Sequence, residues 1–113
     1  MSGLTDNTVR VGALAATLVL LWTSAGAQVL SPSAQRGLNI ARANCARCHS
    51  IDKVSESPLK IAPAFRTLHE RYPVTDLQEP LAEGIVTGHP TMPEFRFDPD
   101  QVRDLVAFLQ TLE

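Results

Sequence analysis

The segment Cys45-Ala46-Arg47-Cys48-His49 constrains the fold more than any other part of this 113-residue chain. It has the pattern C-x-x-C-H, at which haem becomes covalently attached to a protein. Two thiols three positions apart in a helical turn can each add to one haem vinyl group and form a thioether bond. The histidine that follows then lies beneath the porphyrin, where its imidazole binds the iron. The motif predicts one covalently bound haem c, fixed by Cys45 and Cys48 and ligated on one side by His49.

Two other kinds of site use a C-x-x-C pair. A zinc site needs a second pair of Cys or His ligands at suitable spacing, and His69 and His89 stand apart from each other and from the motif. A redox disulfide of the thioredoxin type needs a strand–helix–strand context, and no alternation typical of strands occurs along the chain. Haem attachment is therefore the preferred interpretation.

Residues 1–27 have the features of a secretory signal peptide. Arg10 and the free amino terminus supply positive charge, residues 11–22 form an apolar run, and Ala25-Gly26-Ala27 has the small-x-small pattern of a cleavage site. The apolar run is short for a membrane span, although an uncleaved anchor is the alternative. We expect export to the periplasm and a mature domain that covers residues 28–113.

The mature region is expected to form one small domain. Its net charge equals the −2 of the whole chain, because residues 1–27 contain one basic and one acidic residue. This charge argues against a nucleic-acid-binding protein, which is typically basic. Both cysteines belong to the haem motif, so no structural disulfide is available. A domain of this size has a modest core, and a central haem would supply the missing apolar volume, so we expect the haem-free chain to fold poorly.

The first helix is expected to span residues 32–48. Ser31 has the hydroxyl preferred at an N-cap, and Pro32 suits the first helical position. Apolar or small residues then recur at spacings of three and four, at Ala34, Leu38, Ala41 and Cys45. Gly37 costs about 1 kcal/mol of helix propensity relative to alanine. A glycine in such a position often marks the close approach of another helix.

Two shorter helices are expected in the middle of the domain, separated by loops. The first follows Pro63 and ends near Tyr72. The second begins near Thr75 or Asp76, because each of them is followed three residues later by a Gln or Glu that would complete a capping box. Pro80 favours a boundary within the first turn or two of this helix.

The last helix has the clearest start in the sequence. Asp98 is the expected N-cap, Pro99 takes the first helical position, and Gln101 closes a capping box. An apolar stripe follows, made of Val102, Leu105, Val106, Leu109 and Leu112, with Phe108 beside it. Together these patterns predict an all-α fold of three to five helices connected by long loops.

A second iron ligand is expected downstream of the motif. Met92, followed by Pro93, is the only methionine besides the initiator. A thioether paired with histidine favours ferrous iron and raises the reduction potential. The alternatives are His89, which would give a bis-histidine haem, and a Met92 that merely fills a gap in the core. We favour Met92 as the second ligand and expect His69, in a predicted helix, at the surface.

In these features the chain resembles the small bacterial class I c-type cytochromes. The resemblance covers residues 28–113. It rests on the C-x-x-C-H motif near the end of the first helix, on Ala62-Pro63, on Met92-Pro93 and on the C-terminal amphipathic helix. It implies a small all-α fold wrapped around one covalently bound haem c with His49 and Met92 as axial ligands.

The resemblance also implies two contacts inside the domain. The first and last helices should cross where Gly37 and Ala41 meet Leu105 and Phe108. The backbone carbonyl of Pro63 should accept a hydrogen bond from the second ring nitrogen of the histidine in the motif, which sets the orientation of the imidazole.

The function that these features imply is electron transfer. An iron with two protein ligands has no open site, so we expect a carrier and not an enzyme. Its partners should be periplasmic or membrane-bound redox proteins, met briefly through a small interface, and not nucleic acid. The alternatives are a haem sensor in which Met92 leaves the iron to admit a gas, a small peroxidase with His89 as distal group, and a haem subunit of a larger oxidoreductase.

Overall fold

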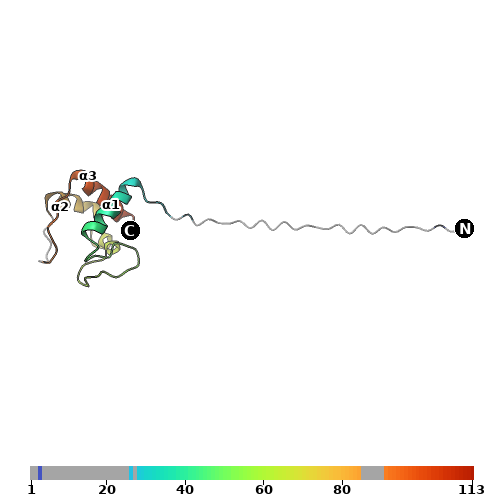
Figure 1. Cartoon of the computed structure of the whole chain (residues 1–113), viewed down its shortest axis with the longest axis horizontal. Helices are drawn as coiled ribbons and strands as arrows, with labels where there is room; N and C mark the ends of the chain where they lie inside the picture. Colours follow the sequence, from blue (N-terminus) through green and yellow to red (C-terminus); the bar gives the residue numbers. More distant parts are fainter. Residues whose placement is uncertain (1–2, 4–25, 27, 85–90) are drawn as a thin grey trace.

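The computed structural model describes residues 3, 26, 28–84 and 91–113. Within them lie three α-helices and two 3-10 helices (η), in the order α1 (Pro32–Asn44), η1 (Phe65–Glu70), η2 (Val74–Leu77), α2 (Gln78–Glu83) and α3 (Pro99–Gln110). No strand occurs among the described residues, which confirms the all-α class predicted from the sequence. Figure 1 shows α1 lying against α3 at one side of the domain, with a long loop between α1 and η1.

Helix α1 begins where the sequence predicts, but it ends earlier than predicted. The Ser31 hydroxyl accepts a hydrogen bond from the backbone N–H of Ala34 at 3.1 Å. The helix ends at Asn44, whereas the sequence predicted an end near residue 48. At this point the carbonyl of Ala41 accepts the N–H groups of both Cys45 (2.8 Å) and Ala46 (3.0 Å). This shared acceptor breaks the regular i to i−4 ladder, and the chain continues as a turn.

The middle helices form near their predicted positions, but with tighter geometry. The helix expected after Pro63 is the 3-10 helix η1, and the next begins as the 3-10 helix η2 before it becomes α2. The capping box expected at Thr75 or Asp76 is wrong, because neither η2 nor α2 has a side-chain cap. Pro80 is the third residue of α2, where its missing N–H leaves no hydrogen bond unmade.

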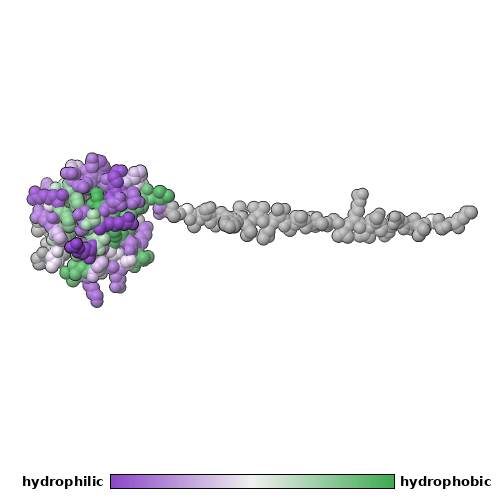
Figure 2. All heavy atoms as spheres, viewed as in Figure 1, coloured by the Kyte–Doolittle hydropathy of each residue, from purple (hydrophilic) through white to green (hydrophobic). Residues whose placement is uncertain are grey.

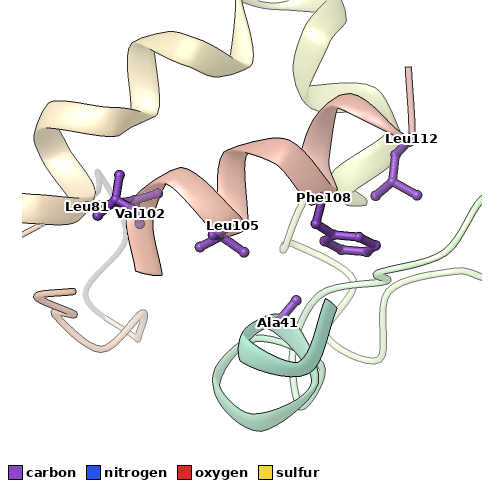
Figure 3. Packing of buried hydrophobic residues seen from close by; sticks show 6 residues of the cluster. All are labelled: Ala41, Leu81, Val102, Leu105, Phe108 and Leu112. Carbon is purple, nitrogen blue, oxygen red and sulfur yellow. The ribbon is translucent and has the colours of Figure 1, made fainter. Parts of the chain in front are cut away.

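Helix α3 has the predicted start and the predicted buried face. Asp98 and Gln101 form a capping box, in which the side-chain oxygen of Gln101 accepts the N–H of Asp98 at 3.0 Å. All five residues of the predicted apolar stripe are buried, and so is Phe108 beside it. Figure 3 shows Leu105 and Phe108 of α3 directed toward Ala41 of α1, and together with Leu81, Val102 and Leu112 they form the main hydrophobic cluster.

The crossing of α1 and α3 depends on Gly37. A Cβ atom at this position would overlap the backbone carbonyl of Asp104 and lie 2.7 Å from Cβ of Phe108. Backbone atoms cannot move aside as the end of a flexible side chain can. The two helices therefore lie closer together than any side chain at residue 37 would permit. The close approach predicted at this glycine is therefore confirmed.

The Gly37→Ala variant is expected to lower the free energy of unfolding by about 2 kcal/mol, within the range typical of overpacking. The added methyl group pushes α3 away from α1. The packing free energy lost in this way exceeds the gain of about 1 kcal/mol in helix propensity. Chemical denaturation of the haem-bound protein measures the change. Gln35→Ala, at an exposed position of the same helix, is the control. A Gly37→Ala variant more stable than the native protein would contradict the close contact.

A charged cluster holds the same two helices together. The guanidinium of Arg36 donates two hydrogen bonds to the carboxylate of Asp104, at 2.7 and 2.9 Å, and the Ser33 hydroxyl donates a third at 2.5 Å. Hydrogen bonds from Arg36 and Ser33 hold the pKa of Asp104 below its usual value. The carboxylate therefore stays ionised in mildly acidic solution, and the cluster that joins α1 to α3 persists there.

The surface of the domain is polar over most of its visible face. Figure 2 shows hydrophilic residues spread across the helical region, with apolar surface confined to smaller areas. Among the residues that the structure describes, no helix is both long enough and apolar enough to cross a bilayer.

Candidate functional site

The turn that follows α1 brings the three residues of the motif to one place. Cys48 donates its backbone N–H to the carbonyl of Cys45 at 3.1 Å, and His49 donates to the same carbonyl at 2.9 Å. These two bonds close a single tight turn. Both cysteines are half-buried and His49 is buried. The turn thus presents two thiols and one imidazole on the same short piece of chain.

The imidazole of His49 is fixed by a backbone carbonyl. Its Nδ1 atom lies 2.7 Å from the carbonyl oxygen of Pro63. Because a carbonyl oxygen only accepts hydrogen bonds, Nδ1 carries the proton and Nε2 keeps the lone pair that a metal needs. The contact that the resemblance implied between these two residues is confirmed. The ring of Phe65 lies beside the imidazole, with centroids 5.0 Å apart.

His49 lies on the wall of an apolar cavity of about 300 Å³. This volume is within the range of small-molecule and cofactor pockets. The same cavity is lined by Cys45 and Cys48 from the turn, and by Leu105 and Leu109 from α3. Further apolar walls come from η1, α2 and the segment 91–97. The cavity therefore lies between the motif and the core face of the last helix.

Met92 lines this cavity as well, although it is far from the motif in the sequence. Its side chain is half-buried. The segment that carries it is tied to the core by the N–H of Phe97, which donates to the carbonyl of Leu81 at 2.9 Å, and by stacking of Phe95 on Phe97 with centroids 5.7 Å apart. The rival ligand His89 lies outside the described residues. His69 is exposed, as predicted.

The state of the cysteines argues against the two alternative uses of a C-x-x-C pair. Burial raises the pKa of the Cys45 thiol to about 11. A redox-active C-x-x-C pair shows the opposite shift, toward a reactive thiolate. In the described part of the chain, no three His, Cys, Asp or Glu side chains are grouped as a metal ion would need. The geometry gives no support to a zinc site or a thioredoxin-type site.

The cavity fits a large flat apolar group with a charged edge. Among its described lining residues, Arg71 is the only one with a charged side chain, and Tyr72 next to it adds a phenol. Neither the guanidinium nor the phenol has a hydrogen-bonding partner within the described residues. A haem presents such a combination, an apolar ring with two propionate carboxylates. Sequence reasoning missed both residues, since no local pattern distinguishes Arg71 from other exposed arginines.

A small helical domain that brings a C-x-x-C-H turn onto the wall of an apolar cavity defines a c-type haem protein. The family model for cytochrome c matches residues 34–113. This match covers well over half of the chain, which therefore belongs to the cytochrome c family.

Two curated relatives agree with this assignment. Cytochrome c-552 of Bradyrhizobium diazoefficiens is 27% identical over 95 residues, which cover 84% of this chain and 89% of the relative. A cytochrome c-553-like protein of Synechocystis is 33% identical over 84 residues, which cover 74% of this chain and 72% of the relative. No solved structure gives a significant match.

Membership of the cytochrome c family confirms several predictions made from the sequence. The chain is a small class I c-type cytochrome with an all-α fold. It carries covalent haem c through Cys45 and Cys48, and it transfers electrons to and from redox partners. It is an electron carrier and not an enzyme, like its relatives.

Proposed function

We propose that this protein is an exported electron carrier whose haem iron is held between His49 and Met92. In this proposal residues 1–27 are removed as a signal peptide and residues 28–113 act in the periplasm. The basic start, apolar run and small-x-small site of the leader support export.

His49 is the proposed first axial ligand. The hydrogen bond of Nδ1 with the Pro63 carbonyl fixes the tautomer and leaves Nε2 available to the metal. Phe65 packs against the ring and restricts its rotation. The hydrogen bond and the ring contact hold the imidazole in one orientation, which would lower the cost of ligation.

Met92 is the proposed second ligand, and one observation supports it most directly. Its side chain lines the same apolar cavity as the imidazole and both thiols of the motif. The other candidate functions need an open iron position, which a neutral thioether close to the metal would occupy. A haem with both axial positions filled cycles between ferric and ferrous iron and exchanges one electron at a time.

The remaining cavity residues would exclude water and balance charge. Leu105 and Leu109 line the cavity from the core face of α3 and would cover the ring. Arg71 is the proposed partner of a propionate carboxylate, because a guanidinium binds carboxylates strongly and has no partner among the described side chains. Keeping water from the iron lowers the reorganisation that accompanies each electron transfer.

The binding of carbon monoxide distinguishes this proposal from a gas sensor or a peroxidase. The reduced native protein is expected to leave carbon monoxide unbound at neutral pH, because Met92 fills the position opposite His49. The Met92→Ala variant is the positive control and should bind the gas. Rapid formation of a carbon monoxide complex by the native protein, followed by visible absorption, would contradict ligation by Met92.

A further inference from the structure

We propose that Arg66 is a positioning residue for the imidazole of His49 and that it acts through Ser50. The proposal deepens the proposed function and rests on it, because it takes His49 as the first axial ligand. Arg66 is not among the described residues that line the cavity which fits the haem. It can therefore influence the iron only through the residues that it holds in place.

Ser50 directly follows His49 in the chain, and hydrogen bonds hold it on three sides. It is buried. Its backbone N–H donates to the hydroxyl of Ser57 at 3.0 Å, and its carbonyl accepts the N–H of Phe65 at 2.9 Å. Its own hydroxyl accepts a hydrogen bond from the guanidinium of Arg66 at 3.3 Å. Because one peptide bond joins Ser50 to His49, a shift of Ser50 would move the backbone that carries the imidazole.

The same guanidinium also holds the far end of the loop that begins at Ser50. It donates to the carbonyl of Ser55 at 2.6 Å, with a longer contact of 3.5 Å to the carbonyl of Asp52. The carboxylate of Asp52 accepts the N–H groups of Val54 and Ser55 at 2.8 and 2.6 Å, which fixes the turn that presents the Ser55 carbonyl. Hydrogen bonds from a charged donor are stronger than those between neutral groups. One cation on η1 therefore holds both ends of the segment 50–55.

The chain just before Arg66 carries both contacts of the imidazole. The carbonyl of Pro63 lies 2.7 Å from Nδ1 of His49, and the ring of Phe65 lies beside the imidazole. Arg66 thus ties the segment that bears the imidazole to the segment that bears its two contacts. Support of this kind keeps a metal ligand in one geometry. An imidazole held in the same way in ferric and ferrous protein needs no rearrangement when the iron gains or loses an electron.

Exchange of the Nδ1 proton of His49 with solvent deuterium tests this role. The proton is replaced only when its hydrogen bond to Pro63 opens, so the exchange rate reports how often the two segments separate. Proton NMR follows the exchange in the ferrous haem-bound protein, since low-spin ferrous iron has no unpaired electrons. The backbone amides of Leu105 and Val106, on the buried face of α3, are the internal reference, because core amides exchange when the whole domain unfolds.

We expect Arg66→Gln to speed exchange of the Nδ1 proton by about tenfold, the scale expected when a hydrogen bond from a charged group is lost. The reference amides of α3 should change much less. Ser50→Ala removes only the hydroxyl acceptor and should act in the same direction, and it keeps the test available if Arg66→Gln takes up no haem. Lys53→Gln is the matched control. It removes one positive charge at an exposed position of the same loop, from a residue that donates none of these hydrogen bonds, and it should leave the exchange rate unchanged.

Three results would overturn the positioning role. Exchange of the Nδ1 proton no faster in Arg66→Gln than in Lys53→Gln would show that Arg66 does not hold the imidazole. Equal acceleration of the Nδ1 proton and the α3 amides would show that Arg66 contributes to global stability alone. An unchanged exchange rate in Ser50→Ala would refute the route through Ser50.

The same spectra separate failure of this role from failure of the proposed function. If the imidazole of His49 binds the iron, the ring current of the porphyrin above it should shift its ring protons strongly upfield in the native ferrous protein. With this shift present, any of the three results leaves the proposed function standing. Without it, ligation of the iron by His49 is refuted, and the positioning role of Arg66 with it.

Discussion

The Met92→Ala variant is expected to lower the reduction potential by on the order of 0.2 V, a part of the roughly 0.8 V over which axial ligands move haem potentials. Loss of the thioether removes a ligand that favours ferrous iron and opens the cavity to water. Potentiometric titration of the native and variant proteins, followed by visible absorption, measures the shift.

A second variant separates ligation from cavity polarity. Leu59→Ala also removes an apolar side chain from the wall of the same cavity, but it leaves the iron ligands untouched. Its potential should stay close to that of the native protein. An equal shift of the reduction potential in Met92→Ala and Leu59→Ala would show that Met92 contributes only packing. An unchanged reduction potential in Met92→Ala would show that Met92 is not an iron ligand.

The second large effect concerns folding without the cofactor. The double variant Cys45→Ala, Cys48→Ala, prepared free of haem, is expected to show no cooperative thermal transition. The cavity of about 300 Å³ lies between α3 and the motif, and without haem its apolar walls would face water. For a small domain, this loss removes a large share of the apolar burial that stabilises the fold.

Circular dichroism during heating measures the transition. The control is the single variant Cys48→Ala with haem still attached through Cys45, which should keep a cooperative transition. The helix-start signals at Ser31 and Asp98 act within one turn of chain, so residual helix is expected without a sharp melt. A sharp, reversible transition in the haem-free double variant would contradict the structural role of the cofactor.

Local patterns were enough to predict the helices with strong end signals. Ser31-Pro32 and Asp98-Pro99 start α1 and α3 as predicted, because caps and proline act within one turn of chain. The end of α1 was misplaced because the shared carbonyl of Ala41 is not visible in sequence. The capping box expected at Thr75 or Asp76 was also wrong, since a 3-10 turn forms first at Val74.

Some residues of the candidate site can likewise be identified from the sequence, and others only from the tertiary fold. The motif identifies Cys45, Cys48 and His49 because covalent attachment demands a fixed spacing. Pro63 and Gly37 followed from the resemblance and from the steric role of glycine, and the structure has both contacts. Arg71, Arg36 and Asp104 were missed, because their roles depend on residues brought together only by the tertiary fold.

The proposed function depends on a haem iron held between an imidazole and a thioether. The visible absorption spectrum of the purified ferric protein tests this most directly, because a weak band at the red end reports sulfur–iron ligation in proteins of this family. We predict that the native protein shows this band and that Met92→Ala loses it. A native ferric spectrum without the band, unchanged by the Met92→Ala substitution, would contradict ligation of the iron by Met92.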